Sequence, residues 1–294
     1  MKTDKRDRRG KSRIVTVVIF CIFLAGVSLL LYPTVSDFWN RWHQSRAIID
    51  YTQQVDELKQ EDYERMWSEA EEYNERLRGN PDRYVMTEED REEYDSLLDV
   101  SDTGIMCYIE IPAIDCSLPV YHGTDDAVLQ SSVGHLEGSS LPVGGEGTHC
   151  VISGHRGLPS ARLFTDLDKL KEGDIFLLRV LERTLTYEVD QITVVEPEDM
   201  SQLEIVEGED LCTLVTCTPY GINTHRLLVR GHRIPNREED TKEKSRVSSP
   251  VIPAAAAGAI LVLAVLAAGI LVRRRRRMNK EEANEHAVDK KRKI

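Results

Sequence analysis

The chain has 294 residues, and its 50 acidic residues outnumber its 38 basic ones, so its formal net charge is −12 at neutral pH. The two ends hold 17 of the basic and 6 of the acidic residues, which leaves 21 basic against 44 acidic residues between them. A middle part this acidic argues against a protein that binds nucleic acid, whose phosphates demand positive charge.

Two long apolar runs, residues 14–32 and 251–272, bracket the acidic part. A helix of about 19 residues is roughly 28 Å long, which matches the hydrocarbon core of a bilayer. We expect the first run to be a retained membrane span. A cleaved signal peptide is the alternative, but this run is longer than a typical signal core and lacks a small-x-small cleavage site before Pro33.

The charges beside the two runs predict how the chain is oriented in the cell membrane. Basic residues crowd the tail 1–13, and an unbroken run of arginines, 273–277, opens the tail 273–294. Positively charged flanks stay on the cytoplasmic side, so we expect both termini inside and residues 33–250 outside. Beside a span, the arginine run is typical of contact with lipid headgroups.

The first exported segment, 33–100, carries a helical pattern. From Ile48 to Leu77 apolar residues recur at steps of three and four, with Glu, Gln, Asp and Arg between them. This pattern predicts one amphipathic helix, or two with a break near residues 60–62, that ends at Gly79-Asn80-Pro81. We expect its apolar stripe to pack on the core of the domain.

After residue 100 the pattern changes to short β-branched runs of period two, separated by Gly, Pro, Asn and Asp. Many short strands with few helices predict a mostly antiparallel barrel or sandwich. A short helix is expected over Leu163–Leu170, and residues 236–250 read as a polar linker. The predicted strands are Ile105–Ile111, Leu118–Tyr121, His149–Ser153, Asp174–Val180, Thr184–Val195, Leu211–Cys217 and Arg226–Ile234.

Five of the six cysteines are exported, so they cannot all pair within one chain. The spacing shows no C-x-x-C and no zinc-ligand pattern, and we expect neither a metal nor another cofactor. Cys107 and Cys116 could face each other across a hairpin, but buried free thiols are the more typical arrangement. We expect the same packing role for Cys150 and Cys212.

Cys217 differs from the other cysteines because it ends a β-branched run just before a turn. A thiol at a strand end faces a cleft, and a fixed cation nearby, here Arg226, favours its thiolate. His155, in Ser153-Gly-His-Arg-Gly, ends another predicted strand. Cysteine, histidine and arginine on separate strand ends predict a site for acyl transfer, with His155, Cys217 and Arg226 as its catalytic residues.

These segments resemble one family, the class C sortases. Thr213-Leu-Val-Thr-Cys217 fits the sortase signature T-L-x-T-C, and the histidine and arginine segments follow the family's order. The resemblance covers roughly residues 104–235. It implies that residues 101–235 form a sortase-type closed antiparallel β-barrel of about eight strands with short helices, in a mostly β protein.

The resemblance also implies a reaction and its partners. A sortase cleaves an LPxTG-like sorting signal between Thr and Gly through a thioacyl-enzyme, and class C members pass the acyl group to a pilin lysine. The expected partners are therefore pilin subunits, or other surface proteins with such signals, and an amine acceptor. The alternatives are a sortase that uses cell-wall peptide amines, a cysteine hydrolase, and a non-catalytic surface scaffold.

One segment departs from the family. Class C sortases usually carry a lid with an Asp-Pro-aromatic motif before the first strand, and here the corresponding residues read Asn80-Pro-Asp-Arg-Tyr84. Asn80 cannot supply the anionic group, although Asp82 could replace it or Tyr84 could act alone. Residues 79–86 are therefore either a self-inhibitory lid or a surface linker.

Overall fold

A computed structural model describes residues 4–100, 102–237 and 240 of the chain. The expected second span (251–272) and the tail after it (273–294) lie outside the described residues, as does most of the expected linker (236–250). The described part comprises the N-terminal helices and the folded domain.

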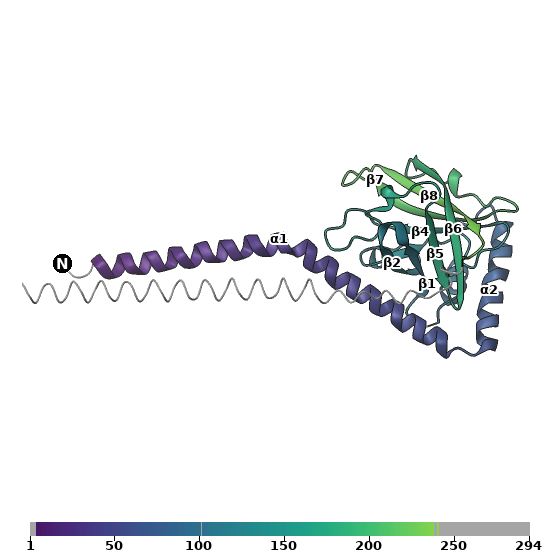
Figure 1. The fold of residues 1–294 in the computed structure, drawn as a ribbon, viewed down its shortest axis with the longest axis horizontal. Coiled ribbons are helices and arrows are strands. Elements are labelled where there is room, and N and C mark those ends of the chain that lie inside the picture. The colour runs from purple at the N-terminus through teal and green to yellow at the C-terminus, as the bar shows by residue number, and fades with distance from the viewer. Residues whose placement is uncertain (1–3, 101, 238–239, 241–294) are drawn as a thin grey trace, which may run out of the picture. The chain divides into compact units, whose positions relative to one another are not determined.

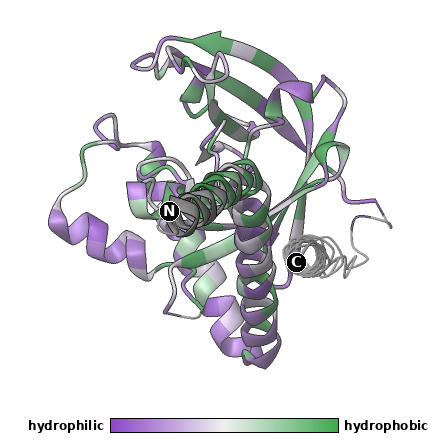
Figure 2. Cartoon of the chain, turned by 90° about the vertical axis from the view of Figure 1, so that its left-hand side faces the viewer, coloured by the Kyte–Doolittle hydropathy of each residue, from purple (hydrophilic) through white to green (hydrophobic). Residues whose placement is uncertain are grey.

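The chain begins with one long helix, α1 (Asp4–Glu57), which contains the first apolar run and continues through Pro33. It bends partway along its length (Figure 1), as expected for a helix that holds a proline. Within the described residues it is the one helix that is long and apolar enough to cross a membrane, and its most apolar stretch is not buried. Figure 2 looks along this helix and shows its hydrophobic turns in green.

The second helix, α2 (Gln60–Arg78), packs on the domain through the stripe that the sequence predicts. Its buried apolar residues recur at steps of three and four, and Gly79 follows as the C-cap. The break between the helices falls at residues 58–59, slightly earlier than expected. The buried apolar residues of α2 are Tyr63, Trp67, Ala70, Tyr73 and Leu77.

A third helix, α3 (Glu88–Ser96), lies in a stretch that the sequence analysis leaves without structure. A capping box begins it: Thr87 accepts a hydrogen bond from the backbone of Asp90, whose side chain accepts one from the backbone of Thr87. Its one buried residue, Tyr94, makes a 2.9 Å hydrogen bond with Nδ1 of the buried His135. A single anchor is too little to produce an amphipathic pattern.

Eight strands close into a barrel in the order β1-β2-β3-β4-β7-β8-β6-β5, which confirms the expected fold class. Two pairings, β2 with β3 and β4 with β7, are parallel, and the others are antiparallel. The seven predicted strands are present with small shifts at their ends. The strands are β1 (Ile105–Ile111), β2 (Cys116–His122), β3 (Val133–His135), β4 (Thr148–Gly154), β5 (Ile175–Val180), β6 (Arg183–Val195), β7 (Asp210–Thr218) and β8 (His225–Ile234).

The strand missing from the prediction is β3, whose three residues, Val-Gly-His, are too few to show alternation. The remaining elements are short: α4 (Asp126–Leu129) and 3-10 turns at Pro112–Ile114, Leu167–Lys169 and Ser201–Leu203. The helix expected over Leu163–Leu170 is thus only the middle one of these turns.

Alternation along the strands divides their apolar side chains between two clusters. The large core takes Ile152 of β4, Leu214 of β7 and Val229 of β8. Their sequence neighbours point the other way and join a second cluster, which we call the outer cluster. The outer cluster consists of Val151, Leu203 and Leu228, with Leu136, Val195, Met200 and Val215 packed against it.

Candidate active site

Strand β7 carries the candidate nucleophile, Cys217, near its C-terminal end. Cys212 and Leu214 point into the large core, whereas Val215 joins the outer cluster. Because side chains alternate along a strand, Cys217 lies on the same face as Val215. Cys217 is half-buried, unlike the fully buried Cys212. The thiol therefore lies at the end of the outer cluster, outside the packed interior of the barrel.

The candidate arginine lies directly across from this cysteine. Strands β7 and β8 are antiparallel, and their register pairs Cys217 with Arg226. Side chains of directly opposite residues share one face, with Cβ atoms about 5 Å apart. Arg226 is half-buried and also shares the face of Leu228 in the outer cluster. The register thus brings together a thiol and a guanidinium that are nine positions apart in sequence.

The candidate histidine reaches the same place from the other side of β7. Strand β4 is parallel to β7, and the register pairs Ser153 with Val215. The Thr216 hydroxyl donates a 2.7 Å hydrogen bond to the carbonyl of Gly154. This bond keeps the two strands together beyond their last ladder pair. His155 directly follows Gly154, so the end of β4 leads it toward the end of β7 that carries Cys217.

Cys217 and Arg226 therefore lie near the paired ends of β7 and β8 on one face of the sheet, and His155 directly follows β4, the neighbour of β7 on its other side. A thiol can attack a carbonyl, an imidazole can transfer a proton, and a guanidinium can stabilise a developing oxyanion. The outer cluster beside them is apolar and suits a peptide with apolar side chains. The arrangement supplies the groups that acyl transfer through a thioester requires.

A second arginine, Arg156, lies beside this group and was not singled out by the sequence analysis. Its side chain is only 9% exposed and forms an ion pair with Asp168. Its guanidinium also donates a 3.3 Å hydrogen bond to the Thr218 hydroxyl and lies 5.9 Å from the ring of Tyr220. Arg156 directly follows His155, and its side chain thus contacts the turn after Cys217. Its position directly after His155, in the run His155-Arg-Gly, was the feature of the sequence that could have indicated this role.

The other cysteines of the domain fit the packing role that the sequence predicts. Strand register places Cys107 opposite Val120 and Cys116 opposite Ile111, so the two cysteines do not face each other across the hairpin. Burial raises the pKa of the Cys107 thiol well above its ordinary value and that of Cys116 to about 12. Such thiols are poor nucleophiles at neutral pH. All six cysteines are free.

The buried histidines hold segments of the fold together. His149 contacts the carbonyl of Glu204 through Nδ1 at 2.8 Å and the hydroxyl of Thr213 through Nε2 at 2.8 Å. A carbonyl only accepts, so Nδ1 carries the proton of the neutral ring. Burial lowers the pKa of His149. This histidine ties the segment between β6 and β7 to the face that bears the outer cluster.

The segment 79–86 is fixed by Arg83, whose side chain is 7% exposed. One guanidinium nitrogen donates to the carbonyl of Leu203 at 3.2 Å and to the carboxylate of Glu204 at 3.0 Å. On the other side, a Cβ atom on Gly138 would lie 2.4 Å from the Arg83 carbonyl oxygen. The segment therefore lies between the β3–β4 and β6–β7 connections, which carry Leu136 and Leu203 of the outer cluster.

Asn80 stands where the lid motif of class C sortases has an aspartate, and it makes a local contact. The side chain of Asn80 accepts a 2.9 Å hydrogen bond from the backbone of Asp82 and forms a local turn. Asp82 itself is exposed. Of the residues considered in the sequence analysis, Tyr84 is the one that approaches the β6–β7 connection, with its hydroxyl 3.5 Å from the Leu203 carbonyl. The buried anchor is Arg83.

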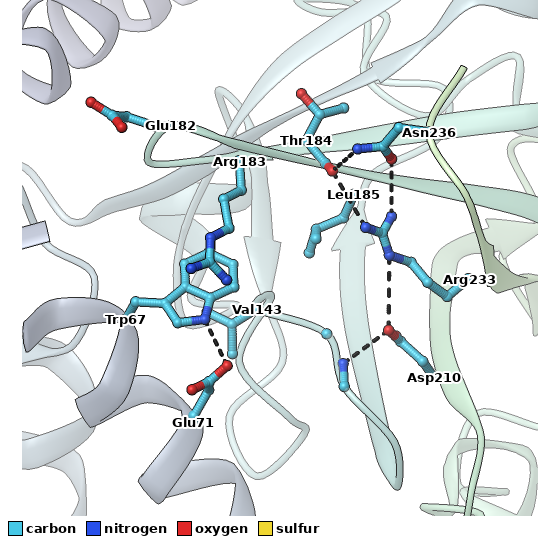
Figure 3. A pocket seen from close by; sticks show the side chains of 12 residues that line it. Trp67, Glu71, Val143, Glu182, Arg183, Thr184, Leu185, Asp210, Arg233 and Asn236 are labelled. Carbon is cyan, nitrogen blue, oxygen red and sulfur yellow. Dashed lines mark hydrogen bonds and ion pairs between the residues drawn. The ribbon is translucent and has the colours of Figure 1, made fainter. Parts of the chain in front are cut away.

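A pocket of about 530 Å³ lies at the opposite end of β7 (Figure 3). It includes Asp210, the first residue of β7, which is seven residues and roughly 23 Å from Cys217. Trp67 stacks there under the Arg183 guanidinium at 4.0 Å, and Arg233 lies 3.9 Å from the Asp210 carboxylate. Glu71 accepts a hydrogen bond from the Trp67 indole, and the pocket is separate from the three candidate catalytic residues.

Comparison with known proteins shows what this chain is similar to. The family model described as a sortase domain matches residues 109–234. The crystal structure of sortase C1 from Streptococcus agalactiae is 55% identical and covers 65% of this chain and 100% of its own, with a TM-score of 0.63. Sortase C from Streptococcus pneumoniae is 48% identical over 65% of this chain and 97% of its own, with a TM-score of 0.59.

Curated relatives give a similar result at lower identity. Sortase D of Bacillus subtilis is 31% identical over 43% of this chain and 62% of its own length. Sortase A of Streptococcus agalactiae is 29% identical over 47% of this chain and 56% of its own. The chain thus spans less than two thirds of the length of these two relatives.

Proposed function

Because this chain belongs to the class C sortases, within a family of cysteine transpeptidases, we propose that it cleaves an LPxTG-like sorting signal between Thr and Gly and transfers the acyl group to a pilin lysine. The observation that carries the proposal is the strand register, which pairs Cys217 with Arg226 and pairs Ser153 with Val215, two positions before His155 and Cys217. Pilin polymerisation is supported by the similar structures, one of which is titled a pilus-related sortase C of group B Streptococcus.

The first half-reaction forms a thioester. The Cys217 thiolate attacks the carbonyl carbon of the threonine, and the electron pair of the C=O bond moves to its oxygen. Arg226 donates hydrogen bonds to that oxygen as it becomes negative, and removing such a donor typically costs about 10²–10³ in rate. The tetrahedral intermediate collapses, the C–N bond to glycine breaks, and His155 gives a proton to the departing amine.

The second half-reaction releases the product. The amine of an incoming lysine attacks the thioester carbon while His155 takes up one of its protons. The C–S bond then breaks, the thiolate of Cys217 is restored, and an isopeptide bond joins two subunits. Transfer to an amine instead of water requires that the acyl group be sheltered from solvent.

Incubating the enzyme with a purified candidate pilin tests this function. We expect a ladder of covalently linked subunits, joined by lysine isopeptide bonds that mass spectrometry identifies. Cys217→Ala should produce no ladder. Cys116→Ala is the matched control, because Cys116 is also a free, partly exposed cysteine but lies on β2, away from the three strands, and it should retain the ladder.

The other functions predict different products in the same assay. Monomers that become linked only when a cell-wall peptide amine is added would indicate the cell-wall-anchoring function. Cleaved pilin with a free threonine carboxylate, whether or not amine is present, would indicate a hydrolase. Unchanged pilin, together with equal behaviour of the wild type and Cys217→Ala, would indicate a scaffold.

We propose further that residues 79–86 act as a lid over the outer cluster. The supporting contacts are those of Arg83 with Leu203 and Glu204 and the close approach of its carbonyl to Gly138. A peptide that uses the outer cluster would displace the segment. Deleting residues 79–86 should raise the rate of cleavage of a short LPxTG peptide, and an unchanged rate would show that the segment is a linker.

We also propose that the chain spans the cell membrane twice, with residues 14–32 and 251–272 as the spans and both termini in the cytoplasm. The support is the candidate membrane helix within α1 and the basic residues that flank both apolar runs. A protease added outside intact cells should remove the domain and leave tags at both ends intact. Loss of the C-terminal tag would show that this end is outside.

A further inference from the structure

Helix α1 carries an exposed aromatic face just beyond its apolar run. Trp39 is 60% and Val35 53% exposed, and the indole rings of Trp39 and Trp42 lie 5.9 Å apart. The Arg46 guanidinium lies 5.3 Å from the Trp42 ring. Steps of four, three and four residues place these side chains in one stripe. We call Val35, Trp39, Trp42 and Arg46 the aromatic face.

The opposite side of the same helix is attached to the domain. Asp37 accepts a 2.9 Å hydrogen bond from the backbone of Arg162, and Asn40 donates one of 2.8 Å to the carbonyl of Ser160. Each tryptophan is two residues beyond one of these anchors, which is about 200° around the helix. The domain therefore cannot cover the aromatic face, and the helix lies between the domain and whatever contacts that face.

The position of this face along the chain favours lipid as its partner. The apolar run ends at Tyr32, three residues before Val35. Tryptophan is enriched in the headgroup layer of membranes, where its ring is apolar and its N–H can bind water or phosphate. Arg46 at the far end of the face can reach lipid phosphates while its stem lies along apolar surface.

The thickness of the headgroup layer limits how the helix can be oriented if it makes this contact. The headgroup layer is roughly 6 Å thick on each side of the hydrocarbon core. A helix that continued straight out of the bilayer would carry Trp42 about 15 Å beyond Tyr32 and out of that layer. A helix that changes direction at Pro33 can instead keep the whole face within it.

We propose that residues 35–46 lie along the outer surface of the membrane, with the aromatic face in the headgroup layer and the domain attached on the opposite side. The anchors Asp37 and Asn40 hold residues 160–162, which follow His155 by only five to seven positions. The membrane contact therefore places the candidate active site close to the bilayer. This last consequence rests on the proposed acyl-transfer function, whereas the lipid contact rests only on the proposed span at residues 14–32.

Tryptophan fluorescence tests the lipid contact, because the chain has only three tryptophans. The full chain is placed in vesicles of phosphatidylcholine and phosphatidylglycerol whose acyl chains carry bromine at shallow or deep positions. Bromine quenches nearby indoles. We expect strong loss of emission from the wild type, and a greater loss with shallow than with deep bromine. The control is the double variant Trp39→Phe/Trp42→Phe, which retains only the buried Trp67 and should lose little emission.

Two results would overturn the proposal. If the wild type loses no more emission to bromine than the double variant and is quenched by iodide in the water, the aromatic face is in solvent. If neither bromine nor iodide quenches Trp39 and Trp42, another protein or a second copy of the chain covers them. Phenylalanine keeps the face apolar, so the helix of the control stays in place.

A kinetic comparison tests the consequence for catalysis. Trp39→Ser/Trp42→Ser should slow turnover of a substrate anchored in the same bilayer and leave turnover of a soluble LPxTG peptide unchanged. If the variant turns over both substrates at the same fraction of the wild-type rate, the aromatic face does not position the active site at the membrane. Inactivity of the wild type on both would instead count against the proposed function and leave the quenching result standing.

Discussion

At the scale of single residues, the candidate site depends on strand register. Cys217 and Arg226 are nine positions apart, yet the antiparallel ladder makes them direct neighbours. The parallel ladder does the same for Cys217 and the residue that follows Gly154. Because one residue of slippage would turn a side chain to the opposite face, the buried outer cluster that fixes this register also fixes the site.

Arg156 provides a prediction at this scale. Its guanidinium holds the turn after Cys217 through Thr218, so Arg156→Gln should loosen that turn and remove a nearby cation. We expect turnover to fall roughly 10- to 100-fold. Turnover of a short LPxTG peptide per folded enzyme is the measurement.

The control for this prediction is Arg162→Gln in the same connection. Arg162 is 58% exposed and pairs with Asp166 one turn along. Arg162→Gln should not alter turnover, since exposed pairs contribute little. An Arg156→Gln enzyme with the wild-type turnover would refute the positioning role.

At the scale of elements, the segment between α2 and α3 combines a fixed anchor with exposed neighbours. Arg83 is buried, whereas Asp82 and Val85 on either side are exposed. Helix α3 follows at once and is held by its capping box and by Tyr94. A short segment fixed at both ends by helices and in the middle by one arginine suits a lid that opens locally.

Arg83→Ala tests this element without shortening the chain. Losing the hydrogen bonds to Leu203 and Glu204 should free the segment, so cleavage of a short LPxTG peptide per folded enzyme should become faster. Arg91→Ala is the matched control, because Arg91 also pairs across to the β3–β4 connection, at 2.7 Å from Glu137, but is half exposed. A slower or equal rate for Arg83→Ala would contradict the lid.

The elements also show how far the sequence carries a prediction. Strand β1 has the predicted ends because its nearly continuous apolar run stops at Pro112. Helix α3 was missed because its residues are almost all charged, although the Thr87 and Asp90 spacing of a capping box was present. The parallel pairing of β4 with β7 arises from contacts between segments that are distant in sequence, so the local sequence pattern of either strand cannot predict it.

Some residues in and around the candidate site could be predicted from the sequence, and others could not. Cys217, Arg226 and His155 were found from strand ends and motif order. Arg83 and Arg156 were not, because their importance comes from burial against partners 120 and 62 residues away along the chain. A charged residue in a polar stretch is usually solvated, and only the fold shows which one is enclosed.

At the scale of the whole molecule, one buried histidine connects the barrel to the β6–β7 connection, which contributes Leu203 to the outer cluster. His149 is 1% exposed, and its neutral ring joins Glu204 to Thr213. Burial lowers its pKa below the ordinary value of 6.5. The nearby Arg230 and Arg83 act in the same direction, while the hydrogen bond to the Glu204 carbonyl and the charge of Asp190 oppose them. The folded protein therefore resists protonation at this position more than the unfolded chain does.

The sign of the resulting pH dependence is set by linkage. As pH falls below 6.5, the unfolded chain takes up a proton at His149 before the folded chain does, so the free energy of unfolding decreases. Thermal unfolding of the full chain in detergent should show a lower Tm at pH 5 than at pH 7. His149→Gln should reduce that difference. An unchanged difference in the variant would show that other groups are responsible.

Trapping the acyl-enzyme tests the central claim most directly. The full-length enzyme is mixed with an LPxTG peptide in the absence of amine, digested, and analysed by mass spectrometry. We predict an adduct on the peptide that contains Cys217, with the mass of the substrate up to its threonine, that hydroxylamine removes and that Cys217→Ala lacks. Cleavage that persists in Cys217→Ala, or an adduct on any other residue, would contradict it.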